Sequence, residues 1–433
     1  MIENKHNPNS APKSDIPPIT TKVRLLKGDR VLWTIVPILL LLSILVVYSS
    51  VANLAYRTGA SNGTVGDLFF SHLMHIALGV MTLFFVYFIG CKVYHKLSIP
   101  IYLLFLGLTI LTYFVGSETN HAARSIIIGG FSLQPSEFLK AATVLLMARQ
   151  LDLKKDVIEK LKIVPSFNPL NWTSKPKLRK QWQIIKEGTI PVLSPIVAAC
   201  AAVVYAHNSS AMLIFFIGFL MLYIGRVHWR ELVKILVLVI AAVALYIGLG
   251  IGRSSTALNR ISSFGAEKAW ATRVSDLSDS DKAMIAIYDG GVTGMGAGRS
   301  IMRARMTHPE SDYIFAVFIE EYGCIMAFVL LTMYIWIFLR AVHLFRRSGW
   351  LFGGLLILGL ATMVTTQAFL HIMVSLNIFP ETGQNLPLIS RGGSSMLCMG
   401  AVFGAILSIS RQIENGTLLP PDSKGGESGA TKL

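Results

Sequence analysis

The chain has 433 residues, of which 53% are hydrophobic and 15% are charged. Its mean hydropathy of +0.58 is too apolar for a soluble globular protein of this length and excludes that class. The net charge of +15 would suggest nucleic-acid binding in a soluble chain. Here the basic residues flank apolar segments, so we expect an integral membrane protein with no nucleic-acid partner.

Ten apolar segments are candidates for membrane spans, because a bilayer core of about 30 Å requires about 20 apolar residues per helix. They cover residues 31–53, 69–90, 98–116, 134–150, 187–206, 209–225, 231–251, 313–340, 350–378 and 393–411. The fourth and the sixth are short, which suits helices that are buried among other helices. The sequence therefore predicts an all-α polytopic membrane protein with about ten transmembrane helices.

Basic residues concentrate in the segments that ten spans place on one side of the membrane. The positive-inside rule identifies this side as cytoplasmic, with both termini inside. The loop of residues 252–311, between spans 7 and 8, then lies outside, and loops of this length are largely exempt from the rule. The basic segments are the N-terminal tail, the loop of residues 151–186, and shorter sets at 226–230, 340–347 and 411.

Both ends of the chain are polar and frame one membrane domain. Residues 1–28 contain no apolar stretch of the kind that a signal peptide requires, and residues 413–433 are rich in Gly, Ser and Lys. We expect both to be disordered cytoplasmic tails. The ten-span membrane domain then covers residues 29–412.

Charged residues inside the spans are costly, so each is a candidate functional residue. Pro135 marks the start of the fourth span, because proline is tolerated in the first helical turn. Glu137 and Lys140 follow on one helical face, close enough to pair. They are either an ion pair that lets a polar helix enter the bilayer or the wall of a cavity that binds a polar ligand.

The outer loop ends in a glycine-rich stretch, residues 289–299. Glycines permit close backbone approach, so this stretch is either a flexible turn or a nest for an anion. Asp312 then opens the next span, as a helix cap or as a functional acid. Glu320 and Glu321 lie about two turns further along and need partners. The cations available to them are Arg124, Lys140, Arg391 and those of the outer loop.

Polar residues also mark the last two spans. His371 lies within the ninth span, where it is either a hydrogen-bonded packing residue or a ligand. Arg391 lies at the outer interface, where it either extends its charge into water or binds a phosphate with its planar guanidinium group.

These segments, in this order, resemble the motifs of the SEDS family (shape, elongation, division and sporulation proteins). Gln134-Pro-Ser-Glu-Phe-Leu-Lys140 is similar to QPSExxK, and Ser311-Asp312-Tyr-Ile-Phe-Ala is similar to TDFIFA. Glu320-Glu321-Tyr-Gly323 is similar to EELG, and Leu386-Pro-Leu-Ile-Ser-Arg-Gly-Gly-Ser-Ser395 to LPxISYGGSS. The resemblance extends from Asp29 to the last helix.

The sequence departs from the family pattern at several positions. Asn120 and Arg124 are retained from the family's NGARRW motif, but the residues between and after them differ. Lys282 replaces a glutamine, His371 replaces an asparagine, and Arg391 replaces a tyrosine. These changes affect loop contacts more than the acid at position 312.

The resemblance implies a peptidoglycan glycosyltransferase that polymerises lipid II into β-1,4 glycan strands at the outer face of the bacterial cytoplasmic membrane. The anomeric centre inverts and undecaprenyl diphosphate leaves. The resemblance then makes Asp312 the catalytic carboxylate. It acts either as the proton acceptor or as a ligand of a divalent cation, Mg²⁺ or Mn²⁺. The candidate substrate-binding residues are Arg124, Glu137, Lys140, Arg299, Glu320, Arg391, Ser394 and Ser395.

The resemblance also implies partners. We expect a class B penicillin-binding protein as transpeptidase, together with other divisome membrane proteins, and a position at the division septum. The last span and its Ser-Arg-Gly-Gly-Ser sequence favour the FtsW-like branch of the family over the elongation-specific RodA branch. Alternative hypotheses are a lipid II flippase and a non-catalytic scaffold of the division machinery.

Overall fold

The computed structural model describes most of the membrane domain. The described residues are 27–58, 65–115, 117–119, 122–128, 131–158, 185–205, 207–249, 277–418 and 420. Most of both predicted tails lies outside them, as do residues 159–184 of the predicted cytoplasmic loop and residues 252–276 of the predicted outer loop.

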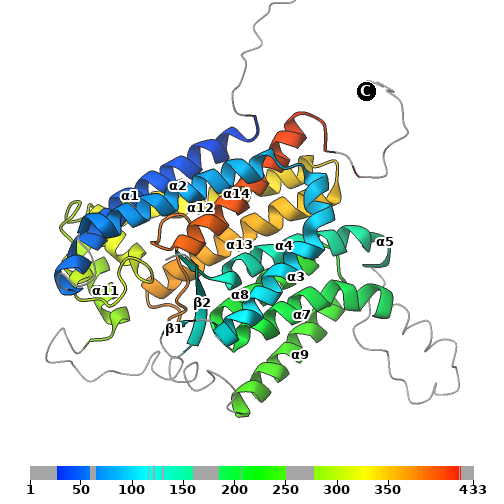
Figure 1. Ribbon diagram of the computed structural model, residues 1–433, viewed down its shortest axis with the longest axis horizontal. Helices are drawn as coiled ribbons and strands as arrows, with labels where there is room; N and C mark the ends of the chain where they lie inside the picture. Colours follow the sequence, from blue (N-terminus) through cyan, green and yellow to red (C-terminus); the bar gives the residue numbers. More distant parts are fainter. Residues whose placement is uncertain are drawn as a thin grey trace, which may run out of the picture.

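Within these residues the chain forms ten helices of at least 15 residues, one for each predicted span (Figure 1). Eight spans are long and apolar enough to cross a membrane, which confirms a polytopic helical membrane protein. The other two are the fourth and the sixth, one of which carries several charges and one of which has 17 residues. The helices are α1 (Arg30–Thr58), α2 (Val65–Phe88), α3 (Cys91–Val115), α4 (Pro135–Leu153), α7 (Ile190–Val204), α8 (Asn208–Ile224), α9 (Trp229–Gly248), α12 (Ile314–Arg347), α13 (Leu351–Ser375) and α14 (Gly393–Glu414).

Several short elements lie between the spans. The sequence did not predict the small antiparallel sheet between α3 and α4, although the β-branched run Ile126-Ile-Ile128 is typical of a strand. Nor did it predict the helix α11 inside the outer loop, which begins at a capping box on Ser278. These elements are β1 (Ser117–Thr119), β2 (Ala122–Ile128), β3 (Phe131–Leu133), α5 (Lys155–Ile158), the π-helix η3 (Ile185–Thr189), α11 (Asp279–Gly290) and the 3₁₀ helix η5 (Met302–Ala304).

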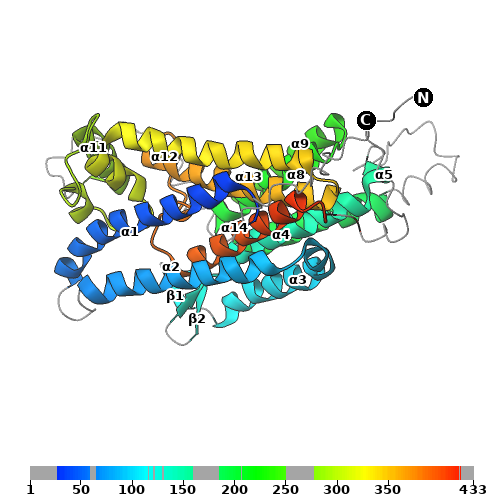
Figure 2. The same cartoon turned by 90° about the horizontal axis from the view of Figure 1, so that it is seen from above.

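The centre of the bundle is formed by α13 and α14, which are mostly buried, whereas α9 lies at the edge (Figure 1). α14 packs most extensively against α2, which runs alongside it (Figure 2). A Cβ atom on Gly400 would lie 2.1 Å from the carbonyl oxygen of Gly79. The two backbones can approach this closely because both positions are glycine, as is common between membrane helices.

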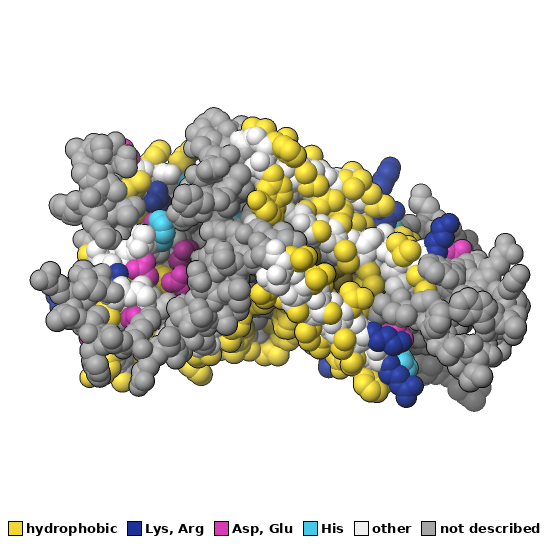
Figure 3. Space-filling model, turned by 90° about the horizontal axis from the view of Figure 1, so that it is seen from below, with side chains coloured by type: hydrophobic (Ala, Val, Ile, Leu, Met, Phe, Trp, Pro, Cys, Tyr) yellow, Lys and Arg dark blue, Asp and Glu magenta, His cyan; other side chains and the backbone are white. Residues whose placement is uncertain are grey.

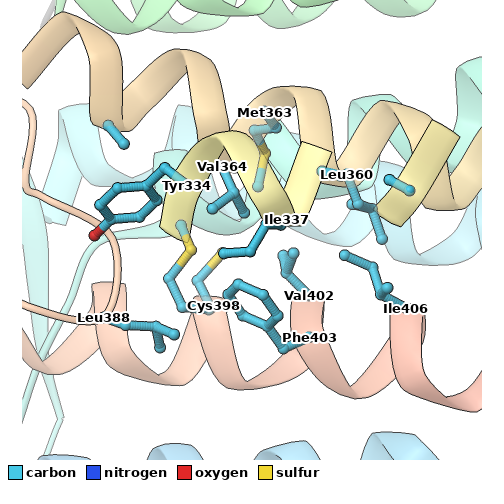
Figure 4. Packing of buried hydrophobic residues seen from close by; sticks show 14 of the residues in the cluster. Tyr334, Ile337, Leu360, Met363, Val364, Leu388, Cys398, Val402, Phe403 and Ile406 are labelled. Atoms are coloured by element: carbon cyan, nitrogen blue, oxygen red, sulfur yellow. The ribbon is translucent and has the colours of Figure 1, made fainter. Parts of the chain in front are cut away.

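The apolar core also fixes the loop between α13 and α14. Tyr334 of α12 belongs to the same buried cluster as Val364, Phe403 and Leu388, which come from α13, α14 and this loop (Figure 4). Its buried hydroxyl donates a hydrogen bond of 2.6 Å to the carbonyl of Pro387. The loop is therefore attached to the bundle at its centre, as a binding site built on a loop requires.

The two ends of the described chain lie at the same end of the bundle. The guanidinium group of Arg340, near the end of α12, donates to the carboxylate of Asp29 at 2.9 Å. The main-chain N–H of Gly28 donates to Glu414 at 2.6 Å. α11 and the start of α12 lie at the opposite end (Figure 1). An even number of crossings agrees with this arrangement, while the cytoplasmic assignment of this end stays a prediction.

Candidate functional site

A polar cavity of about 260 Å³ lies at the end of the bundle that carries α11. Acidic and histidine side chains are visible at this end, while apolar side chains cover the middle of the same face (Figure 3). Three regions that are distant in the sequence build the cavity: α11, the turn before α12, and the end of α13 with the loop that follows it. Its lining residues are Asp279, Thr307, His308, Asp312, Tyr313, His371, Val374, Glu381, Thr382, Gly383 and Gln384.

Asp312 lies in the turn directly before α12 and is partly exposed. Its main-chain N–H donates to the carbonyl of His308 at 3.0 Å. The N-cap position of α12 belongs to Tyr313, whose side chain makes no capping hydrogen bond. Asp312 therefore precedes the N-cap residue, and it is one of the residues that line the cavity.

Two further acids line the same cavity. Asp279 pairs with Lys282 at 3.0 Å and accepts the main-chain N–H of Thr307 at 2.9 Å. Burial raises the pKa of Asp279, but the bonds from Thr307 and Lys282 outweigh it and hold the pKa below its usual value. Glu381 accepts the hydroxyl of Tyr313. The cavity thus holds three carboxyl groups, of which Asp279 is committed to a basic partner.

A buried polar network lies behind the cavity wall. Lys140 is fully buried, and its Nζ donates to Glu137 at 2.8 Å, to Gln367 at 3.3 Å and to Gln384 at 3.1 Å. The predicted pairing of Glu137 and Lys140 is confirmed. Neither residue lines the cavity, but Lys140 reaches it through Gln384.

Glu320 is fully buried, away from the cavity lining. Its carboxylate accepts the main-chain N–H groups of Ile301 at 2.7 Å and Met302 at 3.1 Å. The neighbouring Glu321 pairs with Arg303 at 3.2 Å. Both acids therefore attach the outer loop to α12, and Glu321 also accepts a hydrogen bond from Ser49 of α1.

The glycine-rich stretch packs its backbone against α12. The main-chain N–H groups of Met295 and Gly296 donate to the carbonyls of Glu320 at 2.9 Å and Glu321 at 3.0 Å. A Cβ atom on Gly294 would lie 2.3 Å from the carbonyl oxygen of Glu321. These two amides are occupied, so the anion-nest interpretation is wrong for them, and the segment is not a freely flexible turn.

The remaining candidates lie around the cavity or at the surface. Arg299 is exposed, and Arg391 is partly exposed, with its main-chain N–H bonded to the carbonyl of Glu310 at 2.9 Å. The hydroxyl of Ser394 donates to the carbonyl of Ser132 at 2.6 Å. Ser395 is buried in α14, and Arg124 lies in β2 with its side chain outside the described part. Among the candidates with described side chains, only Asp312 lines the cavity.

The candidate residues predicted from the sequence do not include Asp279, Glu381 and Gln384, which line the cavity. The sequence gives a partial indication of two of them. Glu381 and Gln384 stand in the extended segment between Pro380 and Pro387. Asp279 is one of several acids of the outer loop and had no distinguishing feature there. Only the fold brings it next to Asp312.

Comparison with known proteins gives a consistent result. A sequence model of the FtsW/RodA/SpoVE family, described as cell cycle proteins, matches residues 29–415. Stage V sporulation protein E of Bacillus subtilis is 26% identical over 399 residues, which cover 88% of this chain and 97% of that protein. A probable peptidoglycan glycosyltransferase FtsW of Trichlorobacter lovleyi is 27% identical, with coverage of 93% and 98%. The corresponding FtsW of Caulobacter vibrioides is 28% identical, with coverage of 72% and 71%.

Solved structures share the fold. RodA of Thermus thermophilus, a rod shape determining protein, superposes with a TM-score of 0.58 at 21% identity, covering 90% of this chain and 98% of that one. A chain of a peptidoglycan synthase complex that coordinates polymerization and crosslinking gives a TM-score of 0.63 at 21% identity, with coverage of 89% and 98%. The family match spans the membrane domain that the motifs delimit, and the chain belongs to the FtsW/RodA/SpoVE family of cell cycle proteins, the SEDS family.

Proposed function

We propose that this protein is a peptidoglycan glycosyltransferase that polymerises lipid II into β-1,4 glycan strands. The relatives named FtsW support the activity. The observation that carries it is Asp312 in the wall of a polar cavity at the start of α12. In this proposal the cavity faces the outer side of the membrane, where it meets a sugar on a lipid anchor.

The chemistry needs a proton acceptor and charge stabilisation. The acceptor's hydroxyl oxygen attacks the anomeric carbon of the donor sugar from the face opposite the diphosphate, so the centre inverts. The bond from that carbon to the diphosphate oxygen breaks, and undecaprenyl diphosphate leaves with the bonding electrons. Asp312 takes the hydroxyl proton, and such general-base catalysis contributes about 10²–10⁴-fold in rate.

The leaving diphosphate requires positive charge. No lysine or arginine is among the lining residues of the described cavity. We therefore propose a divalent cation, Mg²⁺ or Mn²⁺, with Asp312 as a ligand. Within the described residues no group of three His, Cys, Asp or Glu side chains could hold a metal. Oxygen donors at Asp312 fit a cation that takes one or two carboxylates and completes its shell with phosphate oxygens and water. When bound, it would neutralise charge that develops on the diphosphate.

The proposal extends to location and partners. The FtsW relatives support a septal role in the bacterial cytoplasmic membrane. The distribution of basic segments in the sequence supports both termini on the cytoplasmic side. A chain of similar fold comes from a peptidoglycan synthase complex, which supports a class B penicillin-binding protein as transpeptidase, with other divisome proteins nearby. Imaging a tagged copy distinguishes this role from an elongation role, because a RodA-type protein follows the lateral wall.

The direct test is reconstitution. The protein is purified with its transpeptidase partner and supplied with lipid II and Mg²⁺ or Mn²⁺, and glycan strands are separated by size. Wild type makes polymer, Asp312→Ala does not, and chelation of the cation stops the reaction. Absence of polymer from folded wild type, or equal polymer from Asp312→Ala, contradicts the proposal.

A lipid II flippase is the second candidate, because the buried Lys140 and Glu137 pair resembles the intramembrane charges of transport pathways. Vesicles separate the two functions. A flippase moves lipid II across the bilayer without making polymer, and its rate does not depend on Asp312.

A further inference from the structure

Two buried polar atoms of the cavity wall have no hydrogen-bond partner among the described residues. They are Nε2 of His371 and Oγ1 of Thr382. The two residues are 1% and 7% exposed, and both line the cavity together with Asp312. Other buried polar atoms of the described chain also lack a partner, but these two belong to residues that line one polar cavity, where a bound polar group would complete their hydrogen bonding.

The orientation of the His371 ring is fixed by its other nitrogen. Nδ1 lies 2.8 Å from the main-chain carbonyl oxygen of Gln384. A carbonyl only accepts, so Nδ1 carries the hydrogen, and the neutral ring keeps a lone pair on Nε2. The side chain of Gln384 is itself bonded to Lys140 at 3.1 Å and to Ser210 at 3.0 Å. The buried network thus holds the ring in place and leaves Nε2 as an acceptor.

The charges around these atoms restrict what they bind. Asp279, Asp312 and Glu381 line the same cavity and disfavour an anionic group beside Thr382. Among the described residues, no group of three His, Cys, Asp or Glu side chains could bind a metal ion. An acceptor nitrogen and a hydroxyl suit a neutral group that donates one hydrogen bond and accepts another. A sugar hydroxyl and an acetamido group both have this character.

We propose that His371 Nε2 and Thr382 Oγ1 form a subsite that hydrogen bonds to a hydroxyl or acetamido substituent of the sugar that reacts at Asp312. This inference rests on the glycosyltransferase function proposed above. It assigns His371 a role in substrate positioning. The imidazole supplies an acceptor further from the backbone than the asparagine that the family pattern has at this position.

Two substitutions at His371 separate substrate binding from packing. In His371→Asn the amide retains a donor near the position of Nδ1, so the bond to Gln384 is kept and the outer acceptor is lost. In His371→Gln the longer side chain places its carbonyl oxygen near the position of Nε2. Steady-state polymerisation of lipid II by the complex with its transpeptidase partner gives KM and kcat for each variant.

The subsite predicts that His371→Asn raises KM about tenfold, whereas His371→Gln stays within about threefold of wild type. Thr382→Val, which removes the hydroxyl at nearly constant shape, raises KM in the same range as His371→Asn. If His371 serves packing alone, the order is reversed, because the variant that keeps the bond to Gln384 then behaves like wild type. That reversed order overturns the proposal.

A binding measurement keeps this test independent of turnover. In full-length Asp312→Ala protein in lipid nanodiscs, His371→Asn and Thr382→Val should each weaken lipid II binding about tenfold. Binding of undecaprenyl diphosphate, which carries no sugar, should not change. Equal weakening of both lipids, or unchanged binding of lipid II, overturns the subsite. Wild type that binds lipid II with this pattern but makes no polymer contradicts only the proposed polymerase function.

Discussion

The start of α12 and the segment two turns further along place carboxylates in two different environments. Asp312 is partly exposed in the wall of a polar cavity. Glu320 is fully buried, and its oxygens accept main-chain N–H groups from Ile301 and Met302. The difference shows that an acid near a membrane helix end can hold a loop in place or face a substrate. Hydrogen-bond partners distinguish the two roles better than position in the sequence does.

The largest expected effect is at the cavity. Asp312→Asn keeps the size of the side chain but removes its capacity to accept a proton. We expect the rate of lipid II polymerisation to fall by about 10²–10⁴-fold with the thermal unfolding midpoint nearly unchanged. A variant that unfolds early would show that Asp312 is a structural residue like Glu320.

The next effect concerns the kink where the glycine-rich stretch meets α12. Gly323 has φ of +78° and ψ of 173°, and a Cβ there would lie 2.3 Å from the carbonyl oxygen of Val292. We expect Gly323→Ala to destabilise the protein by roughly 2–5 kcal/mol. The measurement is thermal unfolding in detergent.

A control for this substitution lies in the same stretch. Gly298 also has a positive φ, of +77°, but a Cβ there meets no atom within 4 Å. Gly298→Ala should therefore cost only about 1–2 kcal/mol, for backbone strain alone. Equal effects of the two substitutions would contradict the close backbone contact.

A smaller effect is expected at Glu320. Glu320→Gln weakens the bonds from Ile301 and Met302, because a neutral amide oxygen is a poorer acceptor than a carboxylate. The free energy of unfolding should fall by about 2 kcal/mol, while kcat of the folded fraction stays near that of wild type. A large loss of kcat in stable protein would place Glu320 in the reaction itself.

Much of the fold follows from the sequence, because long apolar runs such as residues 31–53 and 350–378 can only be buried in lipid or in protein. The contact of Glu137 with Lys140 was also predictable, since their spacing on a helix brings them together. The antiparallel strands around Ile126–Ile128 were not, because apolar runs near a membrane are ambiguous between strand and helix.

The composition of the cavity was less predictable than the fold. Asp279, Asp312 and Glu381 come from three segments, and only tertiary packing makes them neighbours. Conversely, Glu320 and Lys140 have the residue types of a binding site, but the structure engages them in buried contacts. A local sequence pattern does not show which polar side chains will form hydrogen bonds with distant parts of the chain.

The most direct test compares two carboxylate-to-amide substitutions on the same helix. Wild type, Asp312→Asn and Glu320→Gln are purified with the same transpeptidase partner, brought to equal amounts of folded protein, and assayed for glycan strands from lipid II. We predict polymer from wild type and from Glu320→Gln, and a rate lower by about 10²–10⁴-fold from Asp312→Asn. Polymer from Asp312→Asn at the wild-type rate would contradict the assignment of the cavity as the active site.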